Sequence, residues 1–498
     1  MAVASMLPRS IVAQGVGNAD TDLEARLAKD PMRPQFHLLP ASNWMNDPNG
    51  PIYFNGHYHM FCQYNPHASV WGDMSWYHSI SRDMIHWTHL PIAFTPTPGG
   101  PDAYGCFSGS AIAVDKRVYV VYTGTVESTP DKATIRDGEN KIQESQCLAW
   151  SDDPNLVHWT KDPSPIVPLP PPGMKITGFR DPSAWRQDDW YYMTVGSGVA
   201  KVGGCVLLYR SKDMKSWEYM HQLTSGTWNG KSTSNPCDDG EMWECPEFFA
   251  LEAGHVLIYS TEGKVFWQSG KLDPETMLFH PAKTGLLDLG AFYAPKTQLD
   301  ANGQRILWGW IPERRPEAEY KAAGWAGMMS LPRILHLDQD GTLRMLILPT
   351  LATLRSTLPV PPATSGKEIK FILQKASGEV LCTAPRRTEA FEFIVQSSID
   401  ESELLRIAYD PGKHAFMAGD KEIVLEPNDA PQLHAYVDGS VIEVIVSQRE
   451  GYTKRFYYMQ RTAPDITVRI IGGTGMTASA WKIDPISNNR LTTPSALA

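Results

Sequence analysis

Short apolar runs separated by turn residues fill the chain from about residue 35 to residue 335. The runs are five or six residues long and end near Gly, Pro, Asn or Asp, as in Val118–Tyr122, Trp190–Val195 and Arg305–Trp310. An Asn55-Gly56 pair between two such runs is typical of a β-hairpin turn. No convincing amphipathic helix interrupts the runs, so the pattern predicts an all-β region.

A weak internal repeat marks three of the turns in this region. The order Ser-x-Asp followed by Trp occurs at Ser81–Trp87, Ser151–Trp159 and Ser211–Trp217. The spacing of the tryptophans, 72 and 58 residues, is longer than in common propeller repeats but suits four-stranded blades with longer loops. The repeat predicts a β-propeller of five blades over residues 35–347, with chance recurrence in an aromatic-rich chain as the alternative.

The pattern changes after the predicted propeller. Residues 348–366 are rich in Pro and Thr, which is typical of a linker or an extended covering segment. Residues 367–490 again alternate with period two and carry frequent turns, which predicts a β-sandwich. The fold class is therefore all-β, a five-bladed propeller followed by a C-terminal sandwich.

The N-terminal residues 1–34 are predicted to form a tail. Met1–Gly15 is apolar and small and resembles a trimmed secretion signal, although a basic stretch at its start is missing. We therefore expect a secreted or periplasmic protein, with a cytoplasmic location left open.

Composition and charge exclude several classes of partner. The chain has 45 basic and 55 acidic residues, a net charge of −10, and no cluster of Lys and Arg. Nucleic acid and anionic membranes are therefore excluded as partners, and no apolar run is long enough to span a membrane. Seven cysteines are too few for a disulfide scaffold, although an isolated bridge stays open. The 39 Gly and 39 Pro beside many aromatics fit short strands joined by tight turns.

Three carboxylates stand in short, turn-like contexts: Asp47 in Trp44–Gly50, Asp181 before Pro182, and Glu244 before Cys245-Pro246. Each is weak evidence alone, because Asp-Pro-Asn-Gly is a nearly ideal turn sequence. Together they are more informative, since burying acids beside aromatic residues is unfavourable without a function. The innermost strands of a propeller converge on one funnel, so we predict that the three acids line it.

On these residues the sequence resembles glycoside hydrolase family 32, the β-fructofuranosidases. The likeness covers about residues 35–485. The matching stretches are Trp44–Gly50, Gln63–Pro66, Val70–Gly72, Phe107–Ser110, Phe179–Pro182, Trp243–Pro246, Phe292–Ala294, Trp308–Trp310, Val437–Val444 and Ala480–Trp481.

The resemblance implies a role for each acid. Asp47 corresponds to the nucleophile that attacks the anomeric carbon of a fructosyl unit, and Glu244 to the general acid and base. Such carboxyl pairs lie about 5–5.5 Å apart, and their proximity is expected to raise the pKa of the acid that starts protonated. Asp181 would bind fructose hydroxyls, and Arg180 would hold the Asp181 carboxylate ionised and aligned.

A sugar-binding wall also follows from the resemblance, because a furanose ring offers apolar faces and hydroxyls. For Trp71 and Trp310 the alternative is packing in the propeller core. The predicted wall consists of Trp44, Asn46, Gln63, Trp71, Phe107, Ser108, Tyr293 and Trp310.

No cofactor and no metal is predicted. His57 and His59 lie two residues apart but have no third ligand nearby in sequence. Asp238-Asp239 is better explained as a solvated turn than as a calcium site.

The sequence thus predicts a retaining, exo-acting β-fructofuranosidase that removes terminal β-D-fructofuranosyl units from sucrose or fructans. The alternatives are a fructosyltransferase that uses the same intermediate and a non-catalytic sugar-binding propeller. We expect the loops around Glu244 to Pro281 to select among sucrose, inulin and levan. The sequence indicates no oligomeric state.

Overall fold

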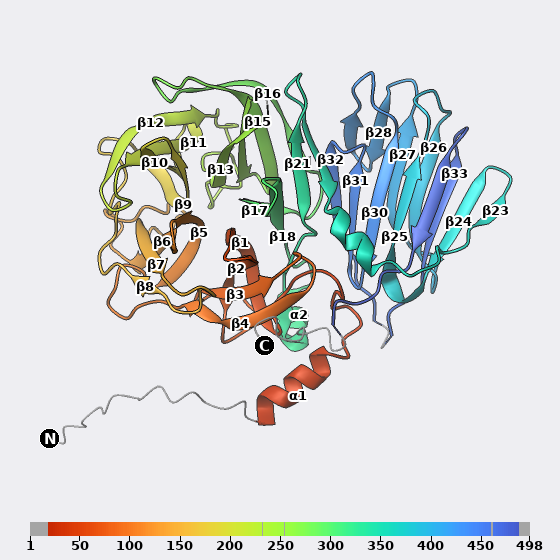
Figure 1. Cartoon of the computed structure of the whole chain (residues 1–498), viewed down its shortest axis with the longest axis horizontal. Helices are drawn as coiled ribbons and strands as arrows, with labels where there is room; N and C mark the ends of the chain where they lie inside the picture. Colours follow the sequence, from red (N-terminus) through yellow and green to blue (C-terminus); the bar gives the residue numbers. More distant parts are fainter. Residues whose placement is uncertain (1–17, 232, 253, 460–461, 488–498) are drawn as a thin grey trace.

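A computed structural model describes residues 18–231, 233–252, 254–459 and 462–487, so the signal-like segment Met1–Gly15 lies outside the described residues. Strands dominate, and the all-β prediction is confirmed (Figure 1). The described residues contain two short α-helices, α1 (Asn18–Leu27), within the predicted tail, and α2 (Glu317–Ala323). Sequence analysis missed α2 because that helix buries no side chain and so has no apolar stripe.

Four separate sheets of four or five strands surround a common centre (Figure 1). The first contains β1 (Asn43–Phe54), β2 (His57–Asn65), β3 (Ser75–Ser81), β4 (Trp87–Phe94) and the short β19 (Trp325–Ala326). The second contains β5 (Gly105–Val114), β6 (Arg117–Glu127), β7 (Ile142–Ser151) and β8 (Thr160–Lys161). The third contains β9 (Ile176–Gln187), β10 (Trp190–Val199), β11 (Gly203–Ser211) and β12 (Trp217–Ser225). The fourth contains β17 (Tyr293–Leu299), β18 (Arg305–Ile311), β20 (Met328–Met329), β21 (Arg333–Leu337) and β22 (Leu343–Ile347).

The prediction of five separate blades is wrong in one respect. Strands β13 (Glu244–Leu251), β14 (Gly254–Thr261), β15 (Lys264–Leu272) and β16 (Phe279–Asp288) do not form a sheet of their own but continue into C-terminal strands as one nine-stranded sheet. The join is a single parallel pair, Asp288 with Gly451. Any side chain at Gly451 would meet the Asp288 carboxylate at 2.2 Å, so glycine permits the join.

The Ser-x-Asp…Trp repeat forms the same turn in three sheets, between β3 and β4, β7 and β8, and β11 and β12. In the first copy the Ser81 hydroxyl accepts hydrogen bonds from the amides of Asp83 and Met84. The Trp87 indole then donates to the Met84 carbonyl oxygen at 3.1 Å. Matching indole bonds close the turns at Trp159 and Trp217. The repeat therefore reflects shared turn chemistry rather than chance.

The C-terminal residues form two sheets that share one hydrophobic core. One has seven strands: β23 (Ala363–Ser365), β24 (Glu368–Leu373), β26 (Phe391–Ser397), β27 (Glu403–Asp410), β28 (Ala415–Ala418), β29 (Lys421–Val424) and β33 (Ile466–Gly472). The other completes the nine-stranded sheet with β25 (Ser377–Thr383), β30 (Gln432–Asp438), β31 (Val441–Val446), β32 (Glu450–Arg455) and β34 (Thr477–Trp481). In the expected linker, Pro349–Leu354 forms a 3-10 helix, η1; a second, η2, spans Gln374–Ala376.

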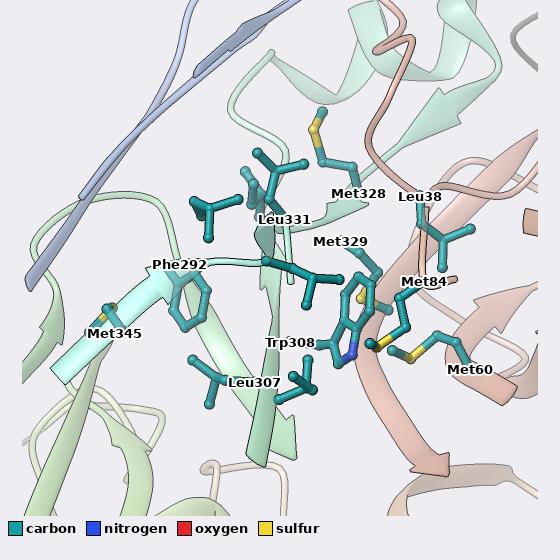
Figure 2. Close-up of a cluster of buried hydrophobic side chains, with 14 of the residues drawn as sticks. Leu38, Met60, Met84, Phe292, Leu307, Trp308, Met328, Met329, Leu331 and Met345 are labelled. Carbon is teal, nitrogen blue, oxygen red and sulfur yellow. The ribbon is translucent and has the colours of Figure 1, made fainter. Parts of the chain in front are cut away.

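The largest core cluster lies among the β1–β4 sheet, the β17–β22 sheet, strands β13–β16 and the N-terminal segment, and it reaches β30 and β31. Figure 2 shows Met60, Met84 and Met329 beside the buried Trp308 ring. Unbranched methionines fill irregular gaps around a large ring, and this packing fixes the sheet that carries β17 and β18.

All seven cysteines fall within the described residues, where each is buried and unpaired, so the isolated bridge that the sequence left open does not form. In the part of the chain that the structure describes, no helix is long and apolar enough to cross a membrane.

Candidate active site

The first strands of the five strand groups, β1, β5, β9, β13 and β17, contact one another in a closed ring. Each has a β-bulge in which two residues face one residue of the neighbouring strand. The bulged pairs are Asn46-Asp47, Phe107-Ser108, Asp181-Pro182, Cys245-Pro246 and Ala294-Pro295. Asp47 thus lies in a bulged strand and not in the turn that the Asp-Pro-Asn-Gly sequence suggests.

These bulges explain the local sequence. Proline has no amide hydrogen, so it is tolerated in a sheet at a bulge where the ladder is interrupted. Asp181, Cys245 and Ala294 have positive φ values of 63°, 48° and 50°, which redirect the chain at the level of the site. The five bulges therefore aim side chains into the centre of the ring.

A cavity of about 610 Å³ opens at this level. Two predicted site residues do not line it: Ser108 lies buried behind Asp47, and Trp44 packs edge-on against Trp310 with ring centroids 6.0 Å apart. The cavity is lined by the other ten, namely Asn46, Asp47, Gln63, Trp71, Phe107, Arg180, Asp181, Glu244, Tyr293 and Trp310.

Asp47 is held by three donors. The Ser108 hydroxyl donates to Oδ2 at 2.5 Å, the Asn46 amide to Oδ1 at 3.2 Å, and the Cys245 thiol to Oδ2 at 3.5 Å. Gln63 donates in turn to the Ser108 hydroxyl at 2.5 Å, which orients that hydroxyl toward Asp47. Burial raises the pKa of Asp47, and the charge of Glu244 adds to this effect.

Asp181 is buried beside the same cysteine. Oδ2 accepts a hydrogen bond from the Cys245 amide at 3.0 Å and lies 3.4 Å from the Cys245 sulfur, whose single thiol proton can be donated either to this oxygen or to Asp47. Oδ1 accepts none from the described residues. Burial raises the pKa of Asp181 to about 7, although the charge of Arg180 opposes the increase. One carboxylate oxygen is thus free for a ligand.

Arg180 does not hold Asp181 as the resemblance implied. Its Nε and one Nη donate to Glu244 at 3.0 and 2.8 Å, and the other Nη donates to Glu144 at 2.9 Å. No hydrogen bond joins Arg180 to Asp181, both of which the structure describes, so the two side chains interact through charge alone.

The pKa of Glu244 also differs from the expectation. Burial acts to raise it, but the charge of Arg180 and hydrogen bonds from Arg180 and Tyr293 outweigh burial and lower it. The Tyr293 hydroxyl donates to Oε2 at 2.7 Å. In the free protein, a proton shared among these three carboxyl groups therefore lies on Asp47 or Asp181 rather than on Glu244.

Sequence reasoning missed two residues behind the site. Glu144 on β7 is fully buried and accepts from Arg180, the Phe179 amide and Thr134. Cys237 accepts from Arg180 at 3.0 Å. Neither residue gave a sequence signal, because Glu144 stands among the polar residues Gln143, Ser145 and Gln146 of its strand.

The mouth of the cavity is formed by a different segment from the one predicted. Glu127, Asp137, Glu139 and Lys141 line it, whereas the expected Glu244–Pro281 stretch contributes only Glu244 and Cys245. Trp71, half exposed, meets the Phe107 ring edge-on at 5.8 Å at the mouth. Both Trp71 and Trp310 line the cavity, so neither is only a core residue.

No group of three or more His, Cys, Asp or Glu side chains within the described ranges is arranged to hold a metal ion. His59, weighed above as a ligand, instead faces His78 with ring nitrogens 3.0 Å apart. Burial lowers the pKa of His59 to about 3.

Comparison with known proteins places this geometry in a family. The family description "Glycosyl hydrolases family 32 N-terminal domain" matches residues 37–347, more than half of the chain. A sucrose-6-phosphate hydrolase of Escherichia coli is 33% identical over 454 residues, which cover 86% of this chain and 89% of that protein. An acid beta-fructofuranosidase of Vicia faba is 37% identical over 62% of this chain, which spans about half (49%) of that relative's length.

Solved structures agree. A GH32 beta-fructofuranosidase of Bombyx mori has a TM-score of 0.77 at 27% identity, covering 96% of this chain and 99% of that one. Fructan 1-exohydrolase IIa of Cichorium intybus, solved in complex with 1-kestose, has a TM-score of 0.75 at 25% identity, covering 91% and 98%. The chain therefore belongs to glycosyl hydrolase family 32.

Proposed function

We propose that this protein is a retaining, exo-acting β-fructofuranosidase that hydrolyses terminal β-D-fructofuranosyl units of sucrose or fructans. One observation carries the proposal: Asp47, Asp181 and Glu244 come from three sheets and meet around Cys245 in one cavity. Paired carboxylates flanking one bond are the arrangement that glycoside hydrolysis requires.

In the first step a carboxylate oxygen of Asp47 attacks C2 of the fructosyl unit, and the bond from C2 to the glycosidic oxygen breaks. Glu244 gives its proton to that leaving oxygen, which departs as the alcohol. Hydrogen bonds from Ser108 and Asn46 orient Asp47 and stabilise its ionised form, as a nucleophile requires, and the Cys245 thiol can add a third.

In the second step water attacks C2 of the fructosyl-enzyme, Glu244 takes the proton of that water, and Asp47 leaves as a carboxylate. Glu244 must therefore hold a proton when substrate is bound, although it is ionised first in the free protein. A sugar that fills the cavity removes water from Glu244, and desolvation favours the neutral acid. The pKa of Glu244 is thus higher in the complex than in the free enzyme.

Asp181 would accept hydrogen bonds from fructose hydroxyls through its free Oδ1. Those bonds strengthen as positive charge develops on the sugar ring in the transition state. Trp71, Phe107 and Trp310 supply apolar surface for the ring, while Asn46 and Gln63 supply amides.

The mouth favours an uncharged leaving group. It carries Glu127, Asp137 and Glu139 against one cation, Lys141, whose ammonium lies 3.3 Å from Glu139. Arg180 is occupied by Glu144 and Glu244. A phosphorylated sugar would meet net negative charge, so we propose neutral sucrose or fructans rather than the substrate in the name of the Escherichia coli relative.

The test is product analysis. Incubation with sucrose in the presence of methanol should yield methyl β-D-fructofuranoside, because retention requires two inversions at C2. The α-anomer would exclude Asp47 as the nucleophile. If no product formed, the protein would be a non-catalytic sugar-binding protein. Oligosaccharides dominating at high sucrose would instead indicate a fructosyltransferase. Initial rates on sucrose, 1-kestose, inulin and levan then define the substrate.

We also propose an architecture and a location. The β13–β16 group would be the fifth blade of a five-bladed propeller over residues 35–347, followed by the linker 348–366 and a sandwich over residues 367–490. The closed ring of five first strands and the shared C-terminal core support this division, and an experimental structure tests it.

We propose that the protein is secreted or periplasmic, which rests on the signal-like segment Met1–Gly15 alone. Cell fractionation tests this location, and a cytoplasmic protein that still carries Met1 would contradict it.

A further inference from the structure

Glu144 on β7 is a buried acid that the reaction above does not use. Its side chain is inaccessible to solvent and does not line the cavity, so it cannot touch the sugar. Oε1 accepts from Arg180 at 2.9 Å, and Oε2 accepts from the Phe179 amide at 2.7 Å and the Thr134 hydroxyl at 2.9 Å. The Thr134 oxygen in turn accepts from the Glu144 amide, so the hydroxyl proton is directed at the carboxylate. All three partners are donors, which suits an ionised carboxylate.

Arg180 on β9 joins Glu144 to Glu244. Its Nε and one Nη donate to Glu244 Oε1 at 3.0 and 2.8 Å, and its other Nη donates to Glu144. The Nη that binds Glu244 also donates to Cys237 Sγ at 3.0 Å. One guanidinium therefore carries two carboxylates from different strands, β7 and β13, and each receives only part of the stabilisation that a single cation can give.

This sharing bears on the proton of Glu244. A general acid must hold a proton, whereas a cation bound to one carboxylate alone strongly favours the ionised form of that carboxylate. Glu144 offsets part of the Arg180 charge and adds a negative charge on the far side of the guanidinium. Both effects favour the protonated form of Glu244.

Other titratable groups face Glu244 from every neighbouring element. Burial acts to raise the pKa of Glu244, but the charge of Arg180 and hydrogen bonds from Tyr293 on β17 and Arg180 lower it. Among these groups, all described by the structure, Arg180 is the one cation, so the share of its charge that reaches Glu244 matters most. The remaining groups are Asp47 on β1, Asp181 on β9, Cys237 and Asp238 before β13, and Cys245 on β13.

We propose that Glu144 is a positioning residue that holds Arg180 between two carboxylates, and so lets Glu244 take up the proton that it gives to the leaving oxygen. This inference rests on the proposed function, in which Glu244 is the general acid. The effect of Glu144 on the charge state of Glu244 can nevertheless be measured without turnover.

The experiment compares the whole protein with Glu144→Gln, which keeps the shape of the side chain and removes its charge. The amide carbonyl oxygen can still accept from Phe179 and Thr134, so we expect the variant to fold. Loss of a nearby negative charge should lower the pKa of Glu244 by about one unit. We therefore expect kcat/KM for sucrose to fall about tenfold at neutral pH, and the loss to shrink toward acidic pH, where Glu244 is protonated in both proteins.

A fructoside with a good leaving group separates this role from a purely structural one. p-Nitrophenyl β-D-fructofuranoside releases a phenolate that needs little help from an acid. Its kcat/KM in Glu144→Gln should stay within about threefold of wild type. An equal loss on both substrates, or no loss on sucrose, in the folded variant would overturn the proposal.

Two further variants complete the comparison. Glu379→Gln is the matched control, because Glu379 on β25 is also a fully buried acid bound to an arginine, Arg355, but does not line the cavity. It should leave both rates unchanged. Glu144→Asp serves if Glu144→Gln does not fold. It keeps the carboxylate one methylene further from Arg180, so we expect a smaller loss that is again confined to sucrose, and equal losses on both substrates would contradict the proposal.

If the wild type proves inactive on fructosides, the proposed function fails separately. Carboxyl ¹³C NMR titration, with Glu244→Gln to assign the signal, then decides. A lower Glu244 midpoint in Glu144→Gln supports the role of Glu144, and an unchanged midpoint refutes it.

Discussion

Two buried clusters in this protein each contain three carboxylates, but they differ in how the charge is balanced. The site cluster consists of Asp47, Asp181, Glu244 and Arg180. The interface cluster consists of Asp288, Asp438, Glu443, His37 and Arg333, where the N-terminal segment and strands β16, β21, β30 and β31 meet.

In the interface cluster every carboxylate oxygen accepts at least one hydrogen bond. His37 bridges Asp438 and Glu443 at 2.8 and 2.9 Å, and Arg333 bridges Asp288 and Glu443 at 2.9 and 2.6 Å. All five side chains are inaccessible to solvent. With two cations and a full set of hydrogen-bond donors, the cluster stabilises the contact between the segments that meet there.

The site cluster has one hydrogen-bonded cation for three acids, and Asp181 Oδ1 is without a donor in the described part of the chain. It also opens to a cavity. Buried acids therefore do not by themselves indicate a catalytic site. Incomplete neutralisation next to a cavity does, because it leaves pKa values perturbed and oxygens free for a ligand.

The largest contrast should come from removing one acid of the site cluster. Asp47→Ala should lower kcat by about 10⁴-fold or more, and Glu244→Gln by about 10²–10⁴-fold. The melting temperature should change little, because burial disfavours the Asp47 carboxylate and the amide in Glu244→Gln keeps a carbonyl oxygen that can accept from Arg180 or Tyr293. Steady-state hydrolysis of sucrose and thermal unfolding measure the two effects. Near-normal turnover in either variant would end the assignment of these roles.

Removing one cation of the interface cluster should lower stability and leave turnover almost unchanged. Arg333→Met leaves Asp288 buried without a cation and Glu443 with His37 alone, and it should lower the free energy of unfolding by about 3–5 kcal/mol. Urea unfolding measures this, and activity per folded molecule should hardly change. Arg406→Met is the control, since its pairs with Glu392 and Glu403 are exposed and should contribute less than about 1 kcal/mol.

The interface cluster also predicts a pH dependence of stability. Burial acts to lower the pKa of His37, but Asp438 and Glu443 raise it to about 9 from 6.5. The folded state binds this proton more tightly, so the stabilisation is complete below pH 6.5 and is lost as the pH rises through about 9. It amounts to at most about 3 kcal/mol. Urea unfolding between pH 6 and 10 should show this loss in the wild type and not in His37→Gln.

The smallest effect concerns charge at the mouth. Asp137→Asn/Glu139→Gln should raise the ratio of kcat/KM for sucrose 6-phosphate over sucrose by about threefold at low salt, because less negative charge repels the phosphate. High salt should abolish the gain. A ratio that does not respond to either change would show that the mouth does not discriminate by charge.

Local features were readable from the sequence. Alternating apolar runs predicted the strands, and Ser81, Ser151 and Ser211 marked equivalent turns because a hydroxyl and the next acid bond nearby amides. The three acids stood out as charges in apolar surroundings. All of these depend on residues close together in the chain.

Contacts between distant segments were not readable. The bonding of Arg180 to Glu144 and Glu244, the Asp288–Gly451 join and the Lys296–Glu247 ion pair each combine separate strands. Nothing in the local pattern selects one partner among many, because long-range pairing is decided by how the sheets close on one another.

By itself the sequence determined an all-β chain and singled out Asp47, Asp181 and Glu244 as the candidate reactive acids, since composition, strand period and motif are local properties. The tertiary structure alone decided that bulges in five first strands aim those acids at one cavity, and that one group of acids is neutralised while the other is not. The charge balance of each cluster and the convergence of the acids on one cavity both depend on residues far apart in the chain, so they arise only when the ring of strands closes.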